Sequence, residues 1–199
     1  MSYKDSGIYP PYEVFYMHTM LFNTEAALAS IDFVVKSIEK LSTDQSPDPF
    51  LNLDENTLLN SLQNIVIQGA ALSKYFWPIR PNHEKRAELL RSSLGIKSDN
   101  LLKNRDLRNL IEHFDERLDI YFSREIAGRF VPQFVGTSHG NEDRRYHTFR
   151  AYYVDTGLFE MLGQKYEIKP ICSEIIRIHN LLIFLESNGG RFRTESDHH

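Results

Sequence analysis

Residues 14–38, VFYMHTMLFNTEAALASIDFVVKSI, decide the fold class. Apolar side chains recur there every seven residues, at Val14, Leu21, Leu28 and Val35. This repeat places the side chains on one face of an α-helix, so the stretch predicts an amphipathic helix of about eight turns. It therefore favours a mainly α-helical protein.

A second helix is predicted after a linker. Residues 42–49 are rich in Ser, Asp and Pro, a composition that ends the first helix. A new apolar stripe then covers residues 58–76. Asp54 or Asn56 can cap the start of this helix, and Pro78 closes it.

Three more helices are predicted further along the chain. Gly69, on the apolar face of the second helix, predicts that another helix approaches closely there. The further ranges are 82–94, which Asn82 caps and Gly95 ends; 98 to about 122, which Ser98 or Asp99 caps; and 171–188, which Gly189 and Gly190 end.

Residues 147–169 carry a strand pattern, with alternating side chains and turn signals at residues 155–157 and 163–164. They predict a small β-hairpin or three-stranded meander, and residues 124–145 are interpreted as a loop. The predicted fold class is mainly α. It is an up-and-down helical bundle of about five helices, with a small β-hairpin or meander inserted before the last helix.

The chain of 199 residues is long enough for one good core and short for two domains. A single domain over residues 1–199 is therefore expected. Its helical core would cover residues 12–122, the loop and β-excursion residues 124–170, and the last helix residues 171–188.

Composition narrows the function classes. The net charge is −4 with His neutral, so contact with nucleic acid would need a local basic patch. Cys172 is the only cysteine, which excludes an internal disulfide and fits a reducing cytosol. No run of about 18 apolar residues is present, and the N-terminal residues lack signal-peptide features. A cytoplasmic protein without membrane association is expected.

The polar face of the fourth predicted helix holds the candidate site. In NLLKNRDLRNLIEHFDERLDIYF, residues 100–122, an ideal helical wheel gathers the apolar side chains in an arc about 100° wide that faces the core. The opposite arc contains Asn109, with Arg108 at one edge and His113 at the other. One interpretation is a solvated face with weak ion pairs at i,i+4, such as Arg108–Glu112.

The other interpretation is metal-free cleavage of RNA. The ordinary pKa of histidine, about 6.5, suits His113 to proton transfer near neutral pH. Arg108 offers a permanent charge and a planar fork of donors to a phosphate. Asn109 could orient the imidazole or donate to an oxyanion. Because the reaction needs both a base and an acid, two such faces in a two-fold dimer would supply the pair.

Residues 108–113, Arg-Asn-Leu-Ile-Glu-His, resemble the signature of the HEPN superfamily: an Arg, a polar residue, and a His after a four-residue gap. LSKYFWP (72–78) and HFDERLD (113–119) also look like one of its prokaryotic branches. The resemblance covers about residues 12–122 and loosely includes the last helix.

The resemblance implies a metal-independent endoribonuclease, without a cofactor, that acts as a homodimer in a toxin–antitoxin or phage-defence system. Arg108 and His113 would be catalytic and Asn109 would support them, with an antitoxin or other protein as a further partner. The chain departs from one branch of these toxins, in which a tyrosine that accepts a transferred nucleotide stands two residues after the His, because Asp115 occupies that position.

Other polar residues give further candidates. Cations and aromatic side chains mix in residues 144–150, and such a mix can hold phosphates and stack bases, or it can be the exposed edge of a hairpin. The candidate RNA-binding residues are Arg105, Arg144, Arg145 and Arg150. No metal site is expected, since the spacing of His139, Glu142, Asp143 and His147 matches no regular metal motif.

Three functions stay open from the sequence. The first is a dimeric HEPN-like endoribonuclease. The second is a non-catalytic HEPN-like binding module for a partner protein or a nucleotide. The third is a structural dimer in which Arg108, Glu112 and His113 satisfy one another across the interface.

Overall fold

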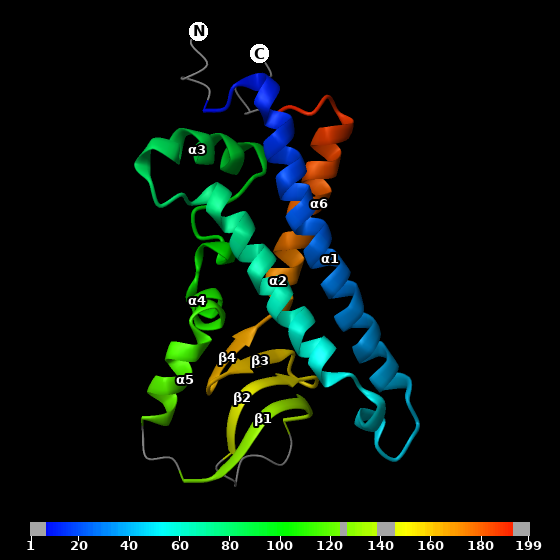
Figure 1. Ribbon diagram of the computed structural model, residues 1–199. Coiled ribbons are helices and arrows are strands. Elements are labelled where there is room, and N and C mark those ends of the chain that lie inside the picture. Colours follow the sequence, from blue (N-terminus) through cyan, green and yellow to red (C-terminus); the bar gives the residue numbers. More distant parts are fainter. Residues whose placement is uncertain (1–6, 124–126, 139–145, 193–199) are drawn as a thin grey trace. The chain divides into compact units, whose positions relative to one another are not determined.

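A computed structural model describes residues 7–123, 127–138 and 146–192 (Figure 1). Within these ranges the chain is mostly helical, and a four-stranded sheet precedes the last helix. The helices are α1 (Glu13–Thr43), α2 (Glu55–Phe76), α3 (Glu84–Ser93), α4 (Asp106–Glu112), α5 (Phe114–Phe122) and α6 (Lys169–Ser187). The strands are β1 (Arg129–Gly136), β2 (Tyr146–Tyr153), β3 (Leu158–Met161) and β4 (Gln164–Glu167). The mainly helical class is confirmed, and the up-and-down bundle stays a prediction.

Several predicted helix ends are confirmed. Asp54 caps α2, because its Oδ1 accepts from the Thr57 backbone N–H at 3.0 Å. Gly95 ends α3 with a φ of +57°, a backbone conformation that glycine adopts without steric cost. The N-cap predicted at Asn82 is wrong, because Asn82 lies in a 3-10 turn, η3 (Pro81–His83), and α3 begins only at Glu84.

The single helix predicted over residues 98–122 is wrong. It is divided into a 3-10 turn, η4 (Leu101–Lys103), and the helices α4 and α5. Asn100, not Ser98 or Asp99, caps η4 by accepting from the Leu102 backbone N–H. The break between α4 and α5 falls at His113. Tyr121 on α5 packs against His147 and Phe149 of β2, and helical periodicity alone does not register such contacts between distant segments.

The sheet confirms the predicted meander and adds a strand to it. β2, β3 and β4 pair antiparallel in sequence order. β1 pairs parallel with β2 at the edge of the sheet, with Arg129 opposite Tyr146. The loop predicted over residues 124–145 is therefore wrong for residues 129–136. Pro132 interrupts the strand pattern there, and an edge strand tolerates a proline that cannot donate to the ladder.

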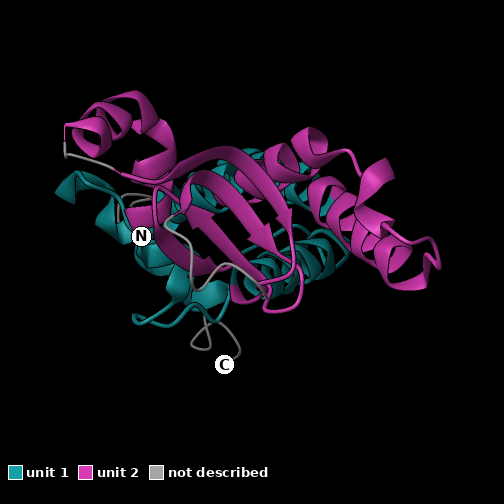
Figure 2. Ribbon diagram, turned by 90° about the horizontal axis from the view of Figure 1, so that it is seen from below, with its two compact units in different colours: residues 1–28, 67–105, 171–199 teal, residues 29–66, 106–170 magenta. Residues whose placement is uncertain are grey.

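The chain divides into two compact units (Figure 2). Unit 1 contains residues 1–28, 67–105 and 171–199, and unit 2 contains residues 29–66 and 106–170. The prediction of one domain over residues 1–199 stays a prediction. Among the helices in the described ranges, none is both long enough and apolar enough to cross a bilayer.

Unit 1 confirms the close approach predicted at Gly69 on α2. A Cβ atom added at this glycine would lie 3.3 Å from Leu102 Cδ2 and 3.4 Å from Ile175 Cδ1. Leu102 and Ile175 are themselves buried. Gly69 therefore lets α2 pack directly against α6 and η4.

Buried polar contacts also join the elements of unit 1. Glu13, only 2 % exposed, accepts hydrogen bonds from the Phe192 backbone N–H and from Arg191 Nε. The Thr24 hydroxyl donates its one proton to the Leu21 carbonyl. Since the same hydroxyl lies 2.9 Å from His179 Nδ1, it must accept there, and Nδ1 therefore carries a proton.

Glu174 on α6 makes the stability of unit 1 depend on pH. Burial raises the pKa of this carboxyl, but hydrogen bonds from Arg177 and Asn100 outweigh burial, so the pKa is lowered overall. A lowered folded-state pKa stabilises the fold above the unfolded value of about 4.3, and the contribution is lost as pH falls through the folded value.

We therefore expect Glu174→Gln to destabilise the protein most near pH 6 to 7 and progressively less below about pH 4. Urea unfolding of both proteins across pH 3–7 measures this difference. A difference in unfolding free energy that stayed constant over that range would contradict the assignment of the pH dependence to Glu174.

Candidate functional site

The three predicted catalytic residues lie on one short part of unit 2. Arg108 and Asn109 are on α4, and His113 is the residue at the break before α5. The His113 N–H still donates to the Asn109 carbonyl at 3.0 Å, and the Arg117 N–H donates to the His113 carbonyl at 3.0 Å. Because the helical hydrogen bonds continue through the break, the turn that carries His113 lies between those of Asn109 and Arg117.

Arg108 is held by its neighbours. Its side chain is 17 % exposed, and its Nη1 donates to Asn109 Oδ1 at 2.6 Å. Its Nε lies 3.1 Å from Glu112 Oε1, yet this buried nitrogen has no hydrogen-bond partner with acceptable geometry. The contact is therefore an ion pair in which the Nε–H of Arg108 does not point at the Glu112 carboxylate. The pair Arg108–Glu112 was the one expected for a solvated face, and the side-chain oxygen of Asn109 accepts from Arg108.

His113 presents its ring to solvent. The side chain is 56 % exposed, and Nδ1 lies 3.8 Å from Glu116 Oε2. At that separation the carboxylate can attract a protonated imidazole without a hydrogen bond between the two groups. The His113 ring is therefore accessible to a ligand.

A polar pocket of about 470 Å³ opens beside this segment, which we call the α4–β4 pocket. It is lined by Asp106, Asn109, Leu110, Arg117, Gln164, Lys165 and Tyr166. Of the predicted catalytic residues, Asn109 contributes to the lining. Its size falls in the range of sites for small ligands.

Sequence reasoning missed the other polar residues of the α4–β4 pocket. Arg117 follows His113 by four residues, so helical spacing could have found it. Lys165 and Tyr166 come from β4, and nothing in the sequence places that strand beside α4. Burial and the nearby Asp106 carboxylate raise the pKa of Tyr166, against the opposing charge of Arg117.

The predicted RNA-binding arginines that the structure describes make internal contacts. Arg105 Nη2 donates to the Trp77 carbonyl at 2.6 Å within unit 1. Arg150 Nε donates to Gln63 Oε1 at 3.0 Å, and its guanidinium lies 4.4 Å from the centroid of the Phe114 ring. Burial lowers the pKa of Arg150.

Residues 144 and 145, the two remaining RNA-binding candidates Arg144 and Arg145, lie outside the described residues. The aromatic part of this segment packs inside unit 2. His147 Nδ1 lies 2.8 Å from the Tyr121 hydroxyl, and Nε2 lies 3.1 Å from the Ala127 carbonyl. A carbonyl only accepts, so Nε2 carries the proton, and a neutral ring then accepts from Tyr121. Phe149 packs edge-on against Tyr121 as well.

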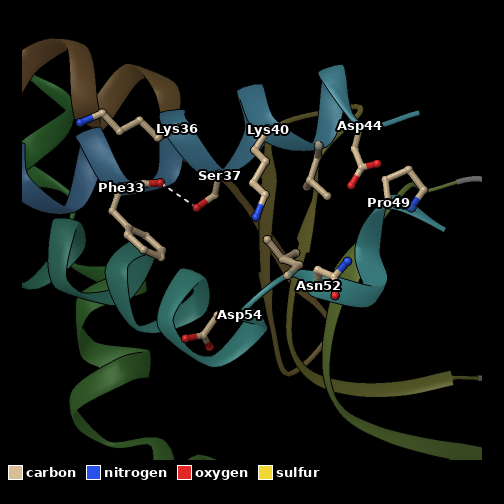
Figure 3. Close-up of a pocket in the computed structure, with 10 residues that line it drawn as sticks. Phe33, Lys36, Ser37, Lys40, Asp44, Pro49, Asn52 and Asp54 are labelled. Carbon is tan, nitrogen blue, oxygen red and sulfur yellow. Dashed lines mark hydrogen bonds between the residues drawn. The ribbon is translucent and has the colours of Figure 1, made fainter. Parts of the chain in front are cut away.

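A second pocket of unit 2, the α1–η2 pocket of about 380 Å³, lies between α1 and the 3-10 turn η2 (Pro49–Asn52) (Figure 3). The side chain of Lys40 extends from α1 toward the segment that carries Asn52. Phe33, Leu41 and Leu53 give the pocket apolar walls. None of the predicted site residues lines this pocket.

Within residues 7–123, 127–138 and 146–192, no group of three or more His, Cys, Asp or Glu side chains is placed to hold a metal ion. Residues 139, 142 and 143, the candidates His139, Glu142 and Asp143, lie outside these ranges.

Comparisons with known proteins assign no family. No protein-family model matches the sequence. No curated protein and no solved structure matches it either.

Proposed function

We propose that this chain is a HEPN-like endoribonuclease that acts as a homodimer, with His113 as the group that transfers protons and Arg108 as the supporting cation. The finer fold proposal goes with it: the helices form an up-and-down bundle of the HEPN type. One observation carries the function. An exposed imidazole lies on the helical turn between Asn109 and Arg117, two residues that line a polar pocket.

The chemistry follows from the properties of the side chains. A neutral His113 removes the proton of a ribose 2′-hydroxyl, and the 2′-oxygen forms a bond to the adjacent phosphorus. The bond between phosphorus and the 5′-oxygen breaks, and this oxygen takes a proton from a protonated His113 of a second copy. The products are a 2′,3′-cyclic phosphate and a 5′-hydroxyl end. Arg108, as the supporting cation, stabilises the extra negative charge of the transition state.

Arg108 also holds its surroundings in place. Its Nη1 fixes Asn109, and its contact with Glu112 keeps the guanidinium on the helix. For Arg108 to meet a phosphate directly, the phosphate would have to replace Glu112. An RNA chain would also have to overcome repulsion by Glu112 and Glu116, which requires compensating positive charge nearby.

A binding module without catalysis is the second candidate, and the Arg108–Glu112 contact favours it. The Arg108 guanidinium is only 17 % exposed and already paired with Glu112, which suits a structural role better than a catalytic one. In this function the same face would hold a partner protein or a nucleotide, and His113 would contribute a contact.

A cleavage assay separates the two functions. Purified chain is incubated with labelled single-stranded RNA in excess chelator, and its oligomeric state is measured by sedimentation. The nuclease proposal predicts shortened RNA and a dimer. Intact RNA after incubation with a well-folded dimer would contradict the nuclease and support the binding module.

A further inference from the structure

The C-terminal end of α2 is held by three arginines. The last carbonyl groups of a helix lack helical donors, and here Pro78 cannot donate either, because a proline has no N–H. Guanidinium groups donate to these carbonyls instead. The contacts join Arg86 Nη2 to the Lys74 carbonyl at 3.4 Å, Arg91 Nη1 to the Phe76 carbonyl, and Arg105 Nη2 to the Trp77 carbonyl at 2.6 Å. All of these residues belong to unit 1.

These contacts leave the positive charge of the arginines in place. A carbonyl oxygen satisfies a donor without cancelling its charge, whereas a carboxylate would cancel it. Of the three arginines, only Arg91 pairs with a carboxylate of the described residues, that of Glu84 at 2.6 Å. The negative end of the α2 dipole, about half an elementary charge, offsets only a small part of the remaining positive charge.

Exposed side chains add to this charge. Lys74, Arg80 and Lys85 are exposed, and none of them forms an ion pair with a carboxylate of the described residues. We call residues 74–91 together with Arg105 the α2–α3 corner, where α3 follows the end of α2 (Figure 1). The corner contains six Lys and Arg residues and two carboxylates, those of Glu84 and Glu88. It therefore has an excess of four positive charges in a chain whose net charge is −4.

Apolar and aromatic side chains lie among these cations. Ile79 is 86 % exposed, and Trp77 is partly exposed. The Arg86 guanidinium lies 5.8 Å from the centroid of the Tyr16 ring, and Tyr16 packs edge-on against Tyr75. The aromatic pair therefore restrains this guanidinium. Cations that contact phosphates, next to apolar and aromatic side chains that contact bases, are typical of surfaces that bind single-stranded nucleic acid.

We propose that the α2–α3 corner binds single-stranded RNA. Lys74, Arg80 and Lys85 contact the phosphates of the strand. Its bases lie against Trp77 and Ile79. The three arginines held by the α2 carbonyls supply a positive potential that attracts the strand. The choice of RNA among polyanions rests on the proposed function, because it adds substrate contacts in unit 1, whereas the excess charge of the corner is independent of that function.

Binding of a fluorescent 2′-O-methyl RNA, which cannot be cleaved, tests the corner by anisotropy at several salt concentrations. A corner variant that combines Lys74→Gln, Arg80→Gln and Lys85→Gln should bind at least about tenfold more weakly. The slope of log K against log salt concentration should fall in magnitude by about two, because each neutralised phosphate of a single strand contributes about 0.7. A control variant with the same loss of charge replaces three exposed lysines of unit 2 by Gln and should leave both quantities nearly unchanged; these are Lys36, Lys40 and Lys169. Both variants should melt close to the original protein, since all six side chains are exposed.

Several results would overturn the corner as an RNA surface. Equal weakening by the corner and control variants would mean general attraction, and unchanged binding by the corner variant would mean that RNA binds elsewhere. If the corner variant lost binding to phosphatidylserine vesicles but kept its binding to RNA, the corner would be a membrane site.

The proposed function can fail separately from this surface. RNA that binds through the corner but stays intact in chelator would contradict the nuclease and support the corner. Cleavage that depends on His113, with RNA binding unchanged in the corner variant, would contradict the corner alone.

Discussion

Replacing His113 by alanine is expected to reduce the rate of RNA cleavage by about 10²- to 10⁴-fold, the usual contribution of a general acid–base group. The melting temperature should hardly change. The side chain is 56 % exposed, and its approach to Glu116 at 3.8 Å is a surface contact that contributes little stability. Initial cleavage rates in chelator and a thermal melt measure both effects.

His18 offers a matched control. Its side chain is 63 % exposed, and its Nε2 lies 3.6 Å from Glu186 Oε1 on α6. It therefore resembles His113 in its exposure and in having a carboxylate nearby. His18→Ala should keep full activity. The role given to His113 is wrong if both variants lose activity equally, or if neither loses any.

Replacing Gly69 by leucine is expected to destabilise the protein by about 2 kcal/mol. Already the Cβ atom would lie 3.3 Å from Leu102 and 3.4 Å from Ile175, and leucine adds three further carbon atoms to that space. The better helix propensity of leucine, about 1 kcal/mol relative to glycine, offsets only part of the overpacking. Urea unfolding measures the difference.

Two further variants serve as controls for Gly69→Leu. Gly69→Ala should stay within about 1 kcal/mol of the original protein, because the side-chain ends of Leu102 and Ile175 can shift by a few tenths of an ångström. Ile67→Leu changes an exposed position of the same helix and should be nearly neutral. A Gly69→Leu protein as stable as the original would contradict the close packing of α2 against α6.

The sequence predicted the parts of the fold that local chemistry controls. The apolar pattern of residues 14–38 predicted α1 as a helix, although Val14 and Val35 of the seven-residue repeat are 44 % and 45 % exposed and do not belong to the buried face. Of the two caps predicted for α2, Asp54 is the one observed, and Gly95 predicted the end of α3. It missed β1 because pairing with β2 is a contact between separate segments, and Pro132 weakens the local pattern. It also missed the break at His113, a residue that is neither glycine nor proline.

The candidate site was predicted only in part for the same reason. Helical spacing correctly placed Arg108 beside Glu112 and put Asn109 and His113 on successive turns. The pocket, however, needs Lys165 and Tyr166 from a strand about fifty residues away along the chain. Arg105 and Arg150 were predicted to bind RNA, but both donate hydrogen bonds within the protein. A sequence does not reveal that a cation already has a partner.

The most direct test of the central claim is to offer the purified protein, in excess chelator, a single-stranded RNA and the same RNA with 2′-deoxy substitution at every position. The proposed chemistry predicts that only the unsubstituted chain is cut, with cyclic phosphate and 5′-hydroxyl ends, because the attacking group is the 2′-oxygen. Cutting of both chains, or of neither, would contradict a ribonuclease in which His113 activates that oxygen.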